Sequence, residues 1–115
     1  MLIVDDSELC LVFAREVLIR AGFDVAVSRR LAEFDRILRS WQPDVILADV
    51  RMPEVDGATL CRRLKQSLRT TRVLVVLFSN LSSSQLDSLA ADCGADAYVS
   101  KASGIELMPV THSTL

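Results

Sequence analysis

The sequence predicts an α/β fold in which a parallel sheet of five strands is covered by helices on both faces. Short apolar blocks of strand length alternate along the chain with longer stretches whose apolar residues recur at helical spacing. Strict alternation of this kind is typical of a parallel sheet, because successive parallel strands need a crossover segment between them. The blocks at 44–48 and 73–78 are almost continuously apolar, as expected of strands that are buried on both faces.

Five segments have the length and composition of strands. The first is a short apolar block that ends in two aspartates, and the last is a short block that contains the one tyrosine. The predicted strands are residues 2–4, 23–27, 44–48, 73–78 and 97–99.

The first two predicted helices lie between the first three strands. The first covers residues 7–21 and is closed by Gly22, since glycine is common just beyond a helix C-terminus. The second has apolar residues at helical spacing, and Pro43 marks its end. Its apolar residues are Leu31, Phe34, Ile37, Leu38 and Trp41.

Two more helices precede the fourth and fifth strands. Asp56 is a suitable N-cap for the third helix. Ser82 and Gln85 have the spacing of a capping box at the start of the fourth helix, which ends at Gly94. The apolar stripes are Leu60, Leu64 and Leu68 in the third helix and Leu86, Leu89, Ala90 and Cys93 in the fourth.

Length and charge restrict the class of protein. A chain of 115 residues suits one domain, 1–115, in which residues 109–115 form a weakly patterned tail or a truncated last helix. The net charge of -2 argues against nucleic acid as a direct partner, because phosphate backbones select for clustered cations. The apolar start is followed at once by two acids, so we expect no signal peptide. No apolar run approaches the ~20 residues of a membrane span.

The three cysteines give no sign of a metal site. Cys10, Cys61 and Cys93 are far apart and form no CxxC pair, so neither zinc nor a disulfide framework is indicated. Each lies on an apolar helix face, where free thiols are commonly buried. This pattern fits a reducing compartment, and we expect the chain to be cytoplasmic.

Polar side chains follow four of the predicted strands at the point where each strand ends. Asp5 and Asp6 follow the first strand, Asp49 the third, Ser79 the fourth and Lys101 the fifth. In an open doubly wound sheet, ligands bind outside the carboxyl ends of the strands. We therefore expect these five residues to project toward one crevice.

This set of residue types suits phosphoryl transfer. Three carboxylates that lie close together repel one another unless a cation neutralises them, and oxygen ligands suit Mg²⁺. An aspartate neutralised in this way can attack phosphorus and form an acyl phosphate. Lys101 and the Ser79 hydroxyl could then position and neutralise the phosphoryl oxygens.

Each of these groups, taken alone, has a simpler explanation. Asp5 and Asp6 could form the N-cap of the following helix, where a carboxylate also favours the helix dipole. Asp49 could be a turn residue, and Lys101 a solvated charge. Their shared location at one edge of the sheet favours a common site over these separate explanations.

Four stretches together resemble the receiver domain of two-component response regulators, of the chemotaxis CheY-like type. The resemblance runs from residue 1 to about residue 103, and the acid pair, the D-x-x-M-P-x-x-D-G motif and the lysine are specific as a set. It implies a sheet of order 2-1-3-4-5 in a flavodoxin-like three-layer sandwich. The stretches that carry it are Leu2–Ser7, Asp49–Pro53 with Asp56–Gly57, Phe78–Ser79 and Gly94–Lys101.

The resemblance implies a role for each matching residue. Asp49 would be the phosphoacceptor and, with Asp6, a direct Mg²⁺ ligand. The backbone carbonyl of Arg51 would be the third ligand, and Asp5 would act through water.

The resemblance also implies a conformational switch. Ser79 would be the hydroxyl that turns toward the phosphoryl group, and Tyr98 the aromatic residue that moves inward with it. Lys101 would pair with the phosphoryl oxygens. For Tyr98, the alternative is a half-exposed strand residue without a switch role.

Three positions depart from the family pattern. Ala102 follows the lysine where proline is usual, so we expect a shifted loop after the fifth strand. Asn80 stands where a small residue is usual and could narrow access to Asp49. Arg51 places a long cation beside the site, where it could screen attacking water or contact the phosphoryl group. We therefore hypothesise that Arg51 and Asn80 modulate rates and that the phosphoryl group is lost slowly.

The resemblance implies a signalling switch that accepts a phosphoryl group from a sensor histidine kinase and catalyses only its own phosphorylation and dephosphorylation. An output domain or effector protein would be the second partner. A homodimer could form through the fourth helix, the fifth strand and a last helix, with Leu86, Tyr98 and Ile105 as contact residues. For Leu86, packing in the core is the favoured interpretation.

Two other functions stay open. One is a phosphorylation-independent (pseudo-receiver) interaction module: the five site residues count against it, whereas Asn80 and Ala102 count for it. The other is a phosphatase with an aspartyl nucleophile. That enzyme would need a second acid and a cap or substrate pocket, and the sequence indicates neither.

Overall fold

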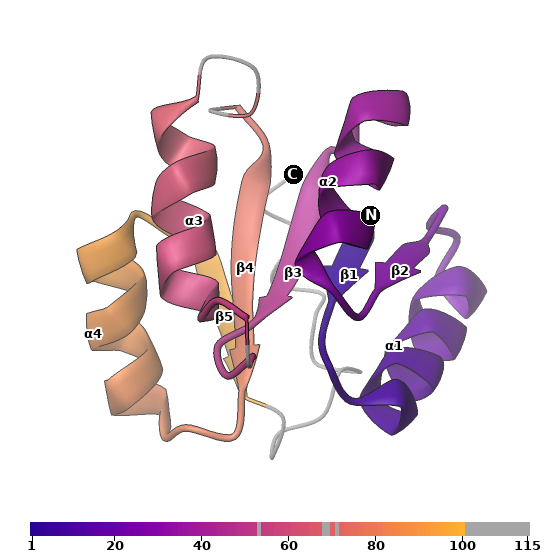
Figure 1. Cartoon of the computed structure of the whole chain (residues 1–115). Helices are drawn as coiled ribbons and strands as arrows, with labels where there is room; N and C mark the ends of the chain where they lie inside the picture. Colours follow the sequence, from indigo (N-terminus) through magenta and orange to yellow (C-terminus); the bar gives the residue numbers. More distant parts are fainter. Residues whose placement is uncertain (53, 68–69, 71, 101–115) are drawn as a thin grey trace.

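The computed structural model describes residues 1–52, 54–67, 70 and 72–100 of the chain (Figure 1). Strands and helices alternate throughout this part, as the sequence predicts. The elements are β1 (Leu2–Val4), α1 (Glu8–Arg20), β2 (Ala26–Ser28), α2 (Leu31–Ser40), β3 (Val45–Asp49), α3 (Gly57–Gln66), β4 (Leu74–Ser79), α4 (Ser83–Cys93) and β5 (Ala97–Ser100).

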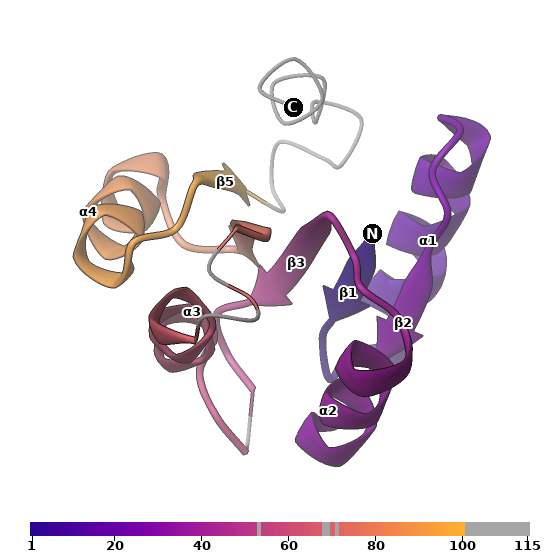
Figure 2. The same ribbon diagram turned by 90° about the horizontal axis from the view of Figure 1, so that it is seen from above.

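The five strands form one parallel sheet of order β2-β1-β3-β4-β5. The strand order reverses at β1, so the carboxyl ends of β1 and β3 flank the point where ligands bind in doubly wound sheets. Helix α1 covers one face of the sheet, and α2, α3 and α4 cover the other (Figure 2). The predicted fold class and strand order are confirmed.

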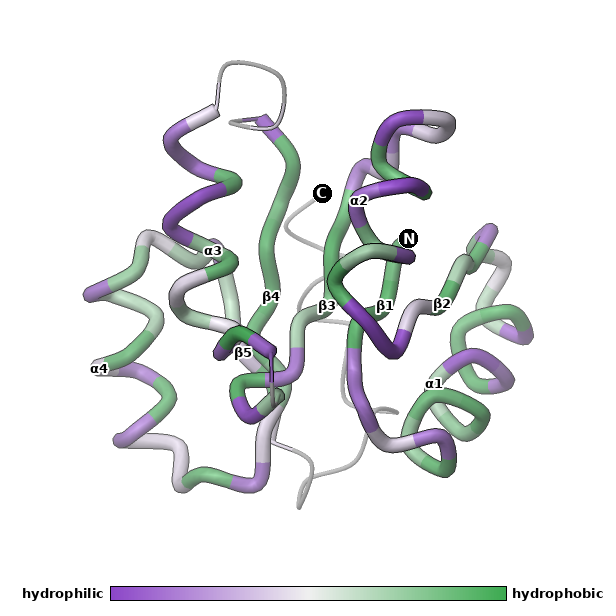
Figure 3. The backbone as a smooth tube through the Cα atoms, viewed as in Figure 1, coloured by the Kyte–Doolittle hydropathy of each residue, from purple (hydrophilic) through white to green (hydrophobic). Residues whose placement is uncertain are grey.

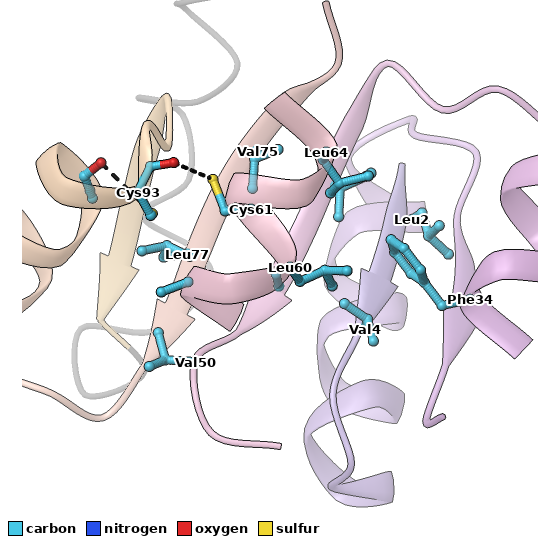
Figure 4. Packing of buried hydrophobic residues seen from close by; sticks show 14 of the residues in the cluster. Leu2, Val4, Phe34, Val50, Leu60, Cys61, Leu64, Val75, Leu77 and Cys93 are labelled. Carbon is cyan, nitrogen blue, oxygen red and sulfur yellow. Dashed lines mark hydrogen bonds between the residues drawn. The ribbon is translucent and has the colours of Figure 1, made fainter. Parts of the chain in front are cut away.

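The core consists of two apolar clusters, one on each face of the sheet. The larger cluster joins the sheet to α2, α3 and α4, and Figure 4 shows part of it. In Figure 3, β1, β3 and β4 are apolar along their length, and the chain turns polar where β1 and β3 end. All five residues of β3 are buried, which agrees with a central strand covered on both faces.

The second strand differs most from its predicted range. The second strand was expected at 23–27, but β2 covers Ala26–Ser28 and pairs from Leu2 opposite Ala26. The end of α1 explains the difference, because the Phe23 N–H donates to the Leu18 carbonyl at 3.1 Å and Gly22 adopts a φ of +96°. These residues therefore close the helix instead of pairing with β1. Strands β3 and β4 are each displaced by one residue from the predicted ranges.

The helix-capping predictions are confirmed. The Asp56 carboxylate accepts from the Thr59 N–H at 2.7 Å at the start of α3. Ser82 and Gln85 form the reciprocal capping box of α4, and Gly94 ends that helix in the left-handed region with φ +81°. Such caps satisfy backbone groups that the ends of a helix leave without partners.

No helix of the described part is long and apolar enough to cross a bilayer. Cys10 is half-buried, whereas Cys61 and Cys93 are buried, and all three are free thiols. The predictions for Ala102, Ile105 and the tail 109–115 concern residues outside the described part. The assignment of 1–115 to a single domain stays a prediction.

Candidate functional site

Three acidic side chains meet at the carboxyl edge of the sheet. Strands β1 and β3 are neighbours, with Val4 opposite Ala48, so the residues that follow them lie next to each other. One carboxylate oxygen from each of Asp5, Asp6 and Asp49 lies within 4.8 Å of the other two. Asp5 is 1% exposed and Asp49 is 5% exposed, whereas Asp6 is open to solvent. The structure therefore brings these three predicted residues together.

Backbone contacts hold the acid pair at the end of β1. The Asp5 N–H continues the ladder to β2 by donating to the Ser28 carbonyl at 3.1 Å. The Asp5 carboxylate accepts from the Ser7 N–H at 3.0 Å. Ser7 is the N-cap of α1, and its hydroxyl accepts from the Cys10 N–H at 3.3 Å. The alternative in which the acid pair caps this helix is therefore wrong, because Ser7 has that role.

Asp49 is fixed from both sides of β3. The next residue, Val50, donates its N–H to the Phe78 carbonyl of β4 at 3.3 Å and accepts from the Gly57 N–H at 2.9 Å. The second bond brings the start of α3 directly onto the backbone of Asp49. The side chain of Arg51 lies in the loop between them and is exposed.

Ser79 lies on the neighbouring strand, at the same edge. Asp49 pairs with Phe78, so Ser79 is one residue beyond that pair on β4. Its side chain is 2% exposed, and its hydroxyl oxygen accepts from the Leu81 N–H at 3.3 Å. Asn80, which follows it, is exposed.

Tyr98 and Leu86 belong to β5, the edge strand beyond β4, and to the preceding helix α4. The half-buried Tyr98 on β5 donates its hydroxyl hydrogen to the Asp87 carboxylate of α4 at 3.4 Å. Burial raises the pKa of Tyr98, and the charge of Asp87 adds to this shift. Leu86 is fully buried, so core packing is confirmed and a surface contact role is wrong. Lys101, the last predicted site residue, is outside the described part.

The donor set fits a hard divalent cation. All three groups are carboxylates, two are withdrawn from solvent, and their oxygens are close enough for one ion to be held among them directly or through water. Mg²⁺ prefers such oxygen ligands and keeps several of its waters, which the exposed side at Asp6 allows. Without a cation, three charges at this spacing repel one another.

Three contributors to the site were not anticipated from the sequence. Gly57 allows α3 to approach the Asp49 carbonyl, although the motif that contains it was noted. Arg29 donates to the Asp6 carbonyl, and Glu54 accepts from the Leu31 N–H. Both of these contacts join residues that are 23 positions apart, so no local pattern could have indicated them.

Comparisons with known proteins agree with this geometry. A family model described as the response regulator receiver domain matches residues 1–110. The chain is 32% identical over 108 residues to the DNA-binding dual master transcriptional regulator RpaA of Synechocystis, covering 94% of this chain and 45% of that regulator. It is 28% identical over 102 residues to the chemotaxis protein CheY of Bacillus subtilis, covering 88% of this chain and 83% of that protein.

A solved structure shows the same architecture. The signal receiver domain of a signal transduction histidine kinase from Syntrophus aciditrophicus is 32% identical, with a TM-score of 0.82, covering 98% of this chain and 85% of that one. The chain spans less than half the length of the RpaA regulator. Relatives therefore carry this domain alone or joined to other parts.

Proposed function

The chain belongs to the response regulator receiver domain family, and on this premise we propose that Asp49 accepts a phosphoryl group from a sensor histidine kinase in the presence of Mg²⁺. The observation that carries this proposal is the meeting of the Asp5, Asp6 and Asp49 carboxylates within 4.8 Å at the end of β1 and β3. Receiver domains are signalling modules of two-component systems, so the phosphoryl group would act as a signal.

The chain's own residues would hold the cation. Asp6 and Asp49 would be direct ligands with the backbone carbonyl of Arg51, and Asp5 would act through a water molecule. A bound Mg²⁺ would neutralise charge on these carboxylates and on the phosphoryl oxygens. Asp49 is 5% exposed and lies beside the exposed Asp6, so a carboxylate largely withdrawn from bulk water supports its role as acceptor.

The transfer would be a substitution at phosphorus. An oxygen of the Asp49 carboxylate forms a bond to phosphorus while the P–N bond to the donor imidazole breaks, and the imidazole takes up a proton. The product is an aspartyl phosphate on the chain and a neutral histidine on the donor. Lys101 would pair with the phosphoryl oxygens from its position after β5.

Ser79 and Tyr98 would convert the new group into a change of shape. The Ser79 hydroxyl now accepts from the Leu81 N–H, and we propose that it turns to contact the phosphoryl oxygens. Tyr98 now donates to Asp87, and its inward movement would break that bond. A phosphoryl group shifts such an equilibrium only through interactions that differ between the two states.

The surface made by α4 and β5 would then meet the partner. An output domain or effector protein is the proposed partner, and a homodimer through the same surface is a second candidate. The proposal includes a cytoplasmic location, in agreement with three free thiols. Arg51 and Asn80, both exposed beside the site, would slow hydrolysis of the phosphoryl group.

Incubation with a small phosphodonor and Mg²⁺, followed by intact mass measurement, tests the proposal. We expect the mass gain of one phosphoryl group in the wild-type chain and none in Asp49→Asn or without Mg²⁺. No gain in the wild type would favour the phosphorylation-independent interaction module. Turnover of phosphate esters would favour the phosphatase. If Arg51→Ala loses its phosphoryl group at the wild-type rate, the proposed role of Arg51 fails, but the assignment of Asp49 as phosphoacceptor stands.

A further inference from the structure

The junction between β2 and α2, residues 29–31, contacts the loop that carries Asp6. The guanidinium of Arg29, the residue after β2, donates from Nε and from Nη2 to the backbone carbonyl of Asp6, at 3.4 Å each. Its Nη1 also lies 3.8 Å from the carboxylate of Glu8, in the first turn of α1. One side chain therefore ties the β1–α1 loop to the β2–α2 junction through two points. A planar fork of donors makes arginine suited to such a contact.

The same junction also contacts the loop that follows Asp49. The N–H of Leu31, the first residue of α2, donates to the Glu54 carboxylate at 3.0 Å. The N-cap residue Arg30 makes no side-chain capping bond, so Glu54 supplies a cap to this helix from another loop. A carboxylate at a helix N-terminus accepts from a donor without a partner and is favoured by the helix dipole.

From these contacts we propose that Arg29 and Glu54 are positioning residues, which hold the two loops of the acidic site at a fixed separation. This inference rests on the proposed function, because the ligands that the loops carry are those assigned to Mg²⁺. Neither side chain touches the cation in this proposal. Arg29 holds the loop after β1, and Glu54 holds the loop after β3. Both loops are thereby attached to the same short junction at residues 29–31.

Repulsion between the acids gives such an anchor a function. Asp5, Asp6 and Asp49 crowd together, and although the strands hold Asp5 and Asp49, repulsion would push apart the loops that begin at Asp6 and Val50 when no cation is bound. Loops that are already held at the binding distance lose less conformational freedom when the ion enters, so affinity rises. Residues that hydrogen-bond the ligating atoms typically change metal affinity by about 10- to 100-fold. Arg29 and Glu54 contact the loops and not the carboxylate oxygens, so their effect should be smaller.

A purely electrostatic role predicts the opposite sign for Arg29. Its positive charge near the acids would repel a cation, so removal of the charge would tighten Mg²⁺ binding. Positioning predicts weaker binding when the guanidinium is removed, and also when it is replaced by lysine, which keeps the charge but loses the fork. The two explanations are therefore separated by the direction of the change.

Mg²⁺ titration of the full chain by calorimetry tests the inference. In Arg29→Met, Arg29→Lys and Glu54→Ala, we expect the dissociation constant to rise about three- to tenfold. Glu54→Gln keeps an acceptor oxygen and should stay within about twofold of the wild type. Glu16→Ala and Arg20→Met, which break an exposed pair of the same residue types on α1, are the matched controls and should also stay within about twofold.

Two results would overturn the inference. One is tighter or unchanged binding in both Arg29 variants, and the other is unchanged binding in Glu54→Ala. If the wild-type chain binds Mg²⁺ and gains a phosphoryl group while the variants bind equally well, only the positioning role fails. If the wild-type chain does not bind Mg²⁺ at all, the proposed function fails and this inference fails with it. Thermal unfolding without Mg²⁺ checks that each variant is folded.

Discussion

The backbone carbonyl of Asp49 lies directly against the Cα of Gly57. A Cβ at position 57 would meet that carbonyl oxygen closer than side chains ever approach, with the Asp49 carbonyl carbon and the Cα of Val50 each 3.0 Å away. All three are backbone atoms, so none can rotate aside. The first residue of α3 therefore sets the position of the end of β3, and with it the position of the acidic site.

We expect Gly57→Ala to reduce the free energy of unfolding by about 3 kcal/mol, because overpacking against a rigid backbone forces the helix to shift. Gly22→Ala is the control, since a Cβ there meets nothing within 4 Å and only the φ of +96° opposes it. That control should cost about 1 kcal/mol. Urea unfolding measures both, and equal losses would contradict a collision at position 57.

Ser28 carries a buried hydroxyl that makes no hydrogen bond to any side chain or backbone group in the described part. The residue is fully buried at the end of β2, opposite Val4. A buried polar group without a partner costs about 1–3 kcal/mol, so Ser28→Ala should raise the free energy of unfolding by about 1 kcal/mol.

Ser7→Ala is the matched comparison for Ser28, because the Ser7 hydroxyl caps α1 by accepting from the Cys10 N–H. This substitution should lower the free energy of unfolding by about 1 kcal/mol. Chemical denaturation of both variants shows whether each substitution raises or lowers the free energy of unfolding. Destabilisation in Ser28→Ala would mean that its hydroxyl has a partner after all.

Asp96 connects three elements at the edge of the sheet opposite the acidic site. Its carboxylate accepts from the Lys65 ammonium of α3 at 2.6 Å and from the Val75 N–H of β4 at 2.8 Å. Asp96→Ala should cost about 1–2 kcal/mol, since the partly buried Val75 N–H loses its acceptor and the half-buried Lys65 loses its ion pair. Asp96→Asn keeps an acceptor oxygen and should cost less.

Asp92→Ala is the control for Asp96. Asp92 pairs with Arg62 at the same distance of 2.6 Å, but its side chain is 70% exposed. An exposed ion pair contributes about 0–1 kcal/mol, so this variant should be close to the wild type in thermal unfolding. A loss in Asp92→Ala as large as that in Asp96→Ala would contradict the importance of burial.

Because of the buried Cys61 thiol, we expect the free energy of unfolding to fall at alkaline pH. Burial raises the pKa of its thiol to about 12, and the contact with Cys93 adds to the shift (Figure 4). The ordinary value is 9.0, so between these two values the unfolded chain releases a proton that the folded chain keeps. Stability is therefore undiminished below about pH 9 and falls as the pH rises toward about 12, by up to about 1.4 kcal/mol per pH unit.

Urea unfolding under reducing conditions, at several values from about pH 8 to about pH 10, measures this slope. Cys61→Ala should be less stable at neutral pH, because it leaves a small cavity, but its stability should decline less between these values. Parallel curves for the two proteins would show that another group causes the decline.

Periodicity in the sequence predicted the order and type of the elements because each strand and helix has its own apolar pattern, and α3 and α4 also begin with recognisable caps. It also predicted that Asp5, Asp6 and Asp49 would meet, since parallel strands end at one edge of the sheet. The start of β2 was misplaced because the closing turn of α1 uses apolar residues that also resemble a strand.

The contacts of Arg29 and Glu54 could not be read from any local pattern. Each depends on the packing of β2 beside β1 and of the β3–α3 loop beside α2, over 23 residues of sequence. The full burial of Leu86, by contrast, agrees with the core packing that its position in the apolar stripe of the fourth helix favoured. The sequence thus indicates which residues do chemistry more readily than which residues hold them in place.

The most direct test of the account is the chemical location of the phosphoryl group. After incubation with a small phosphodonor and Mg²⁺, borohydride reduction should convert an aspartyl phosphate to homoserine, and peptide mass mapping then identifies its position. We expect homoserine at position 49 and only there. Homoserine at Asp5, Asp6 or any other aspartate, with Asp49 unmodified, would contradict the central claim.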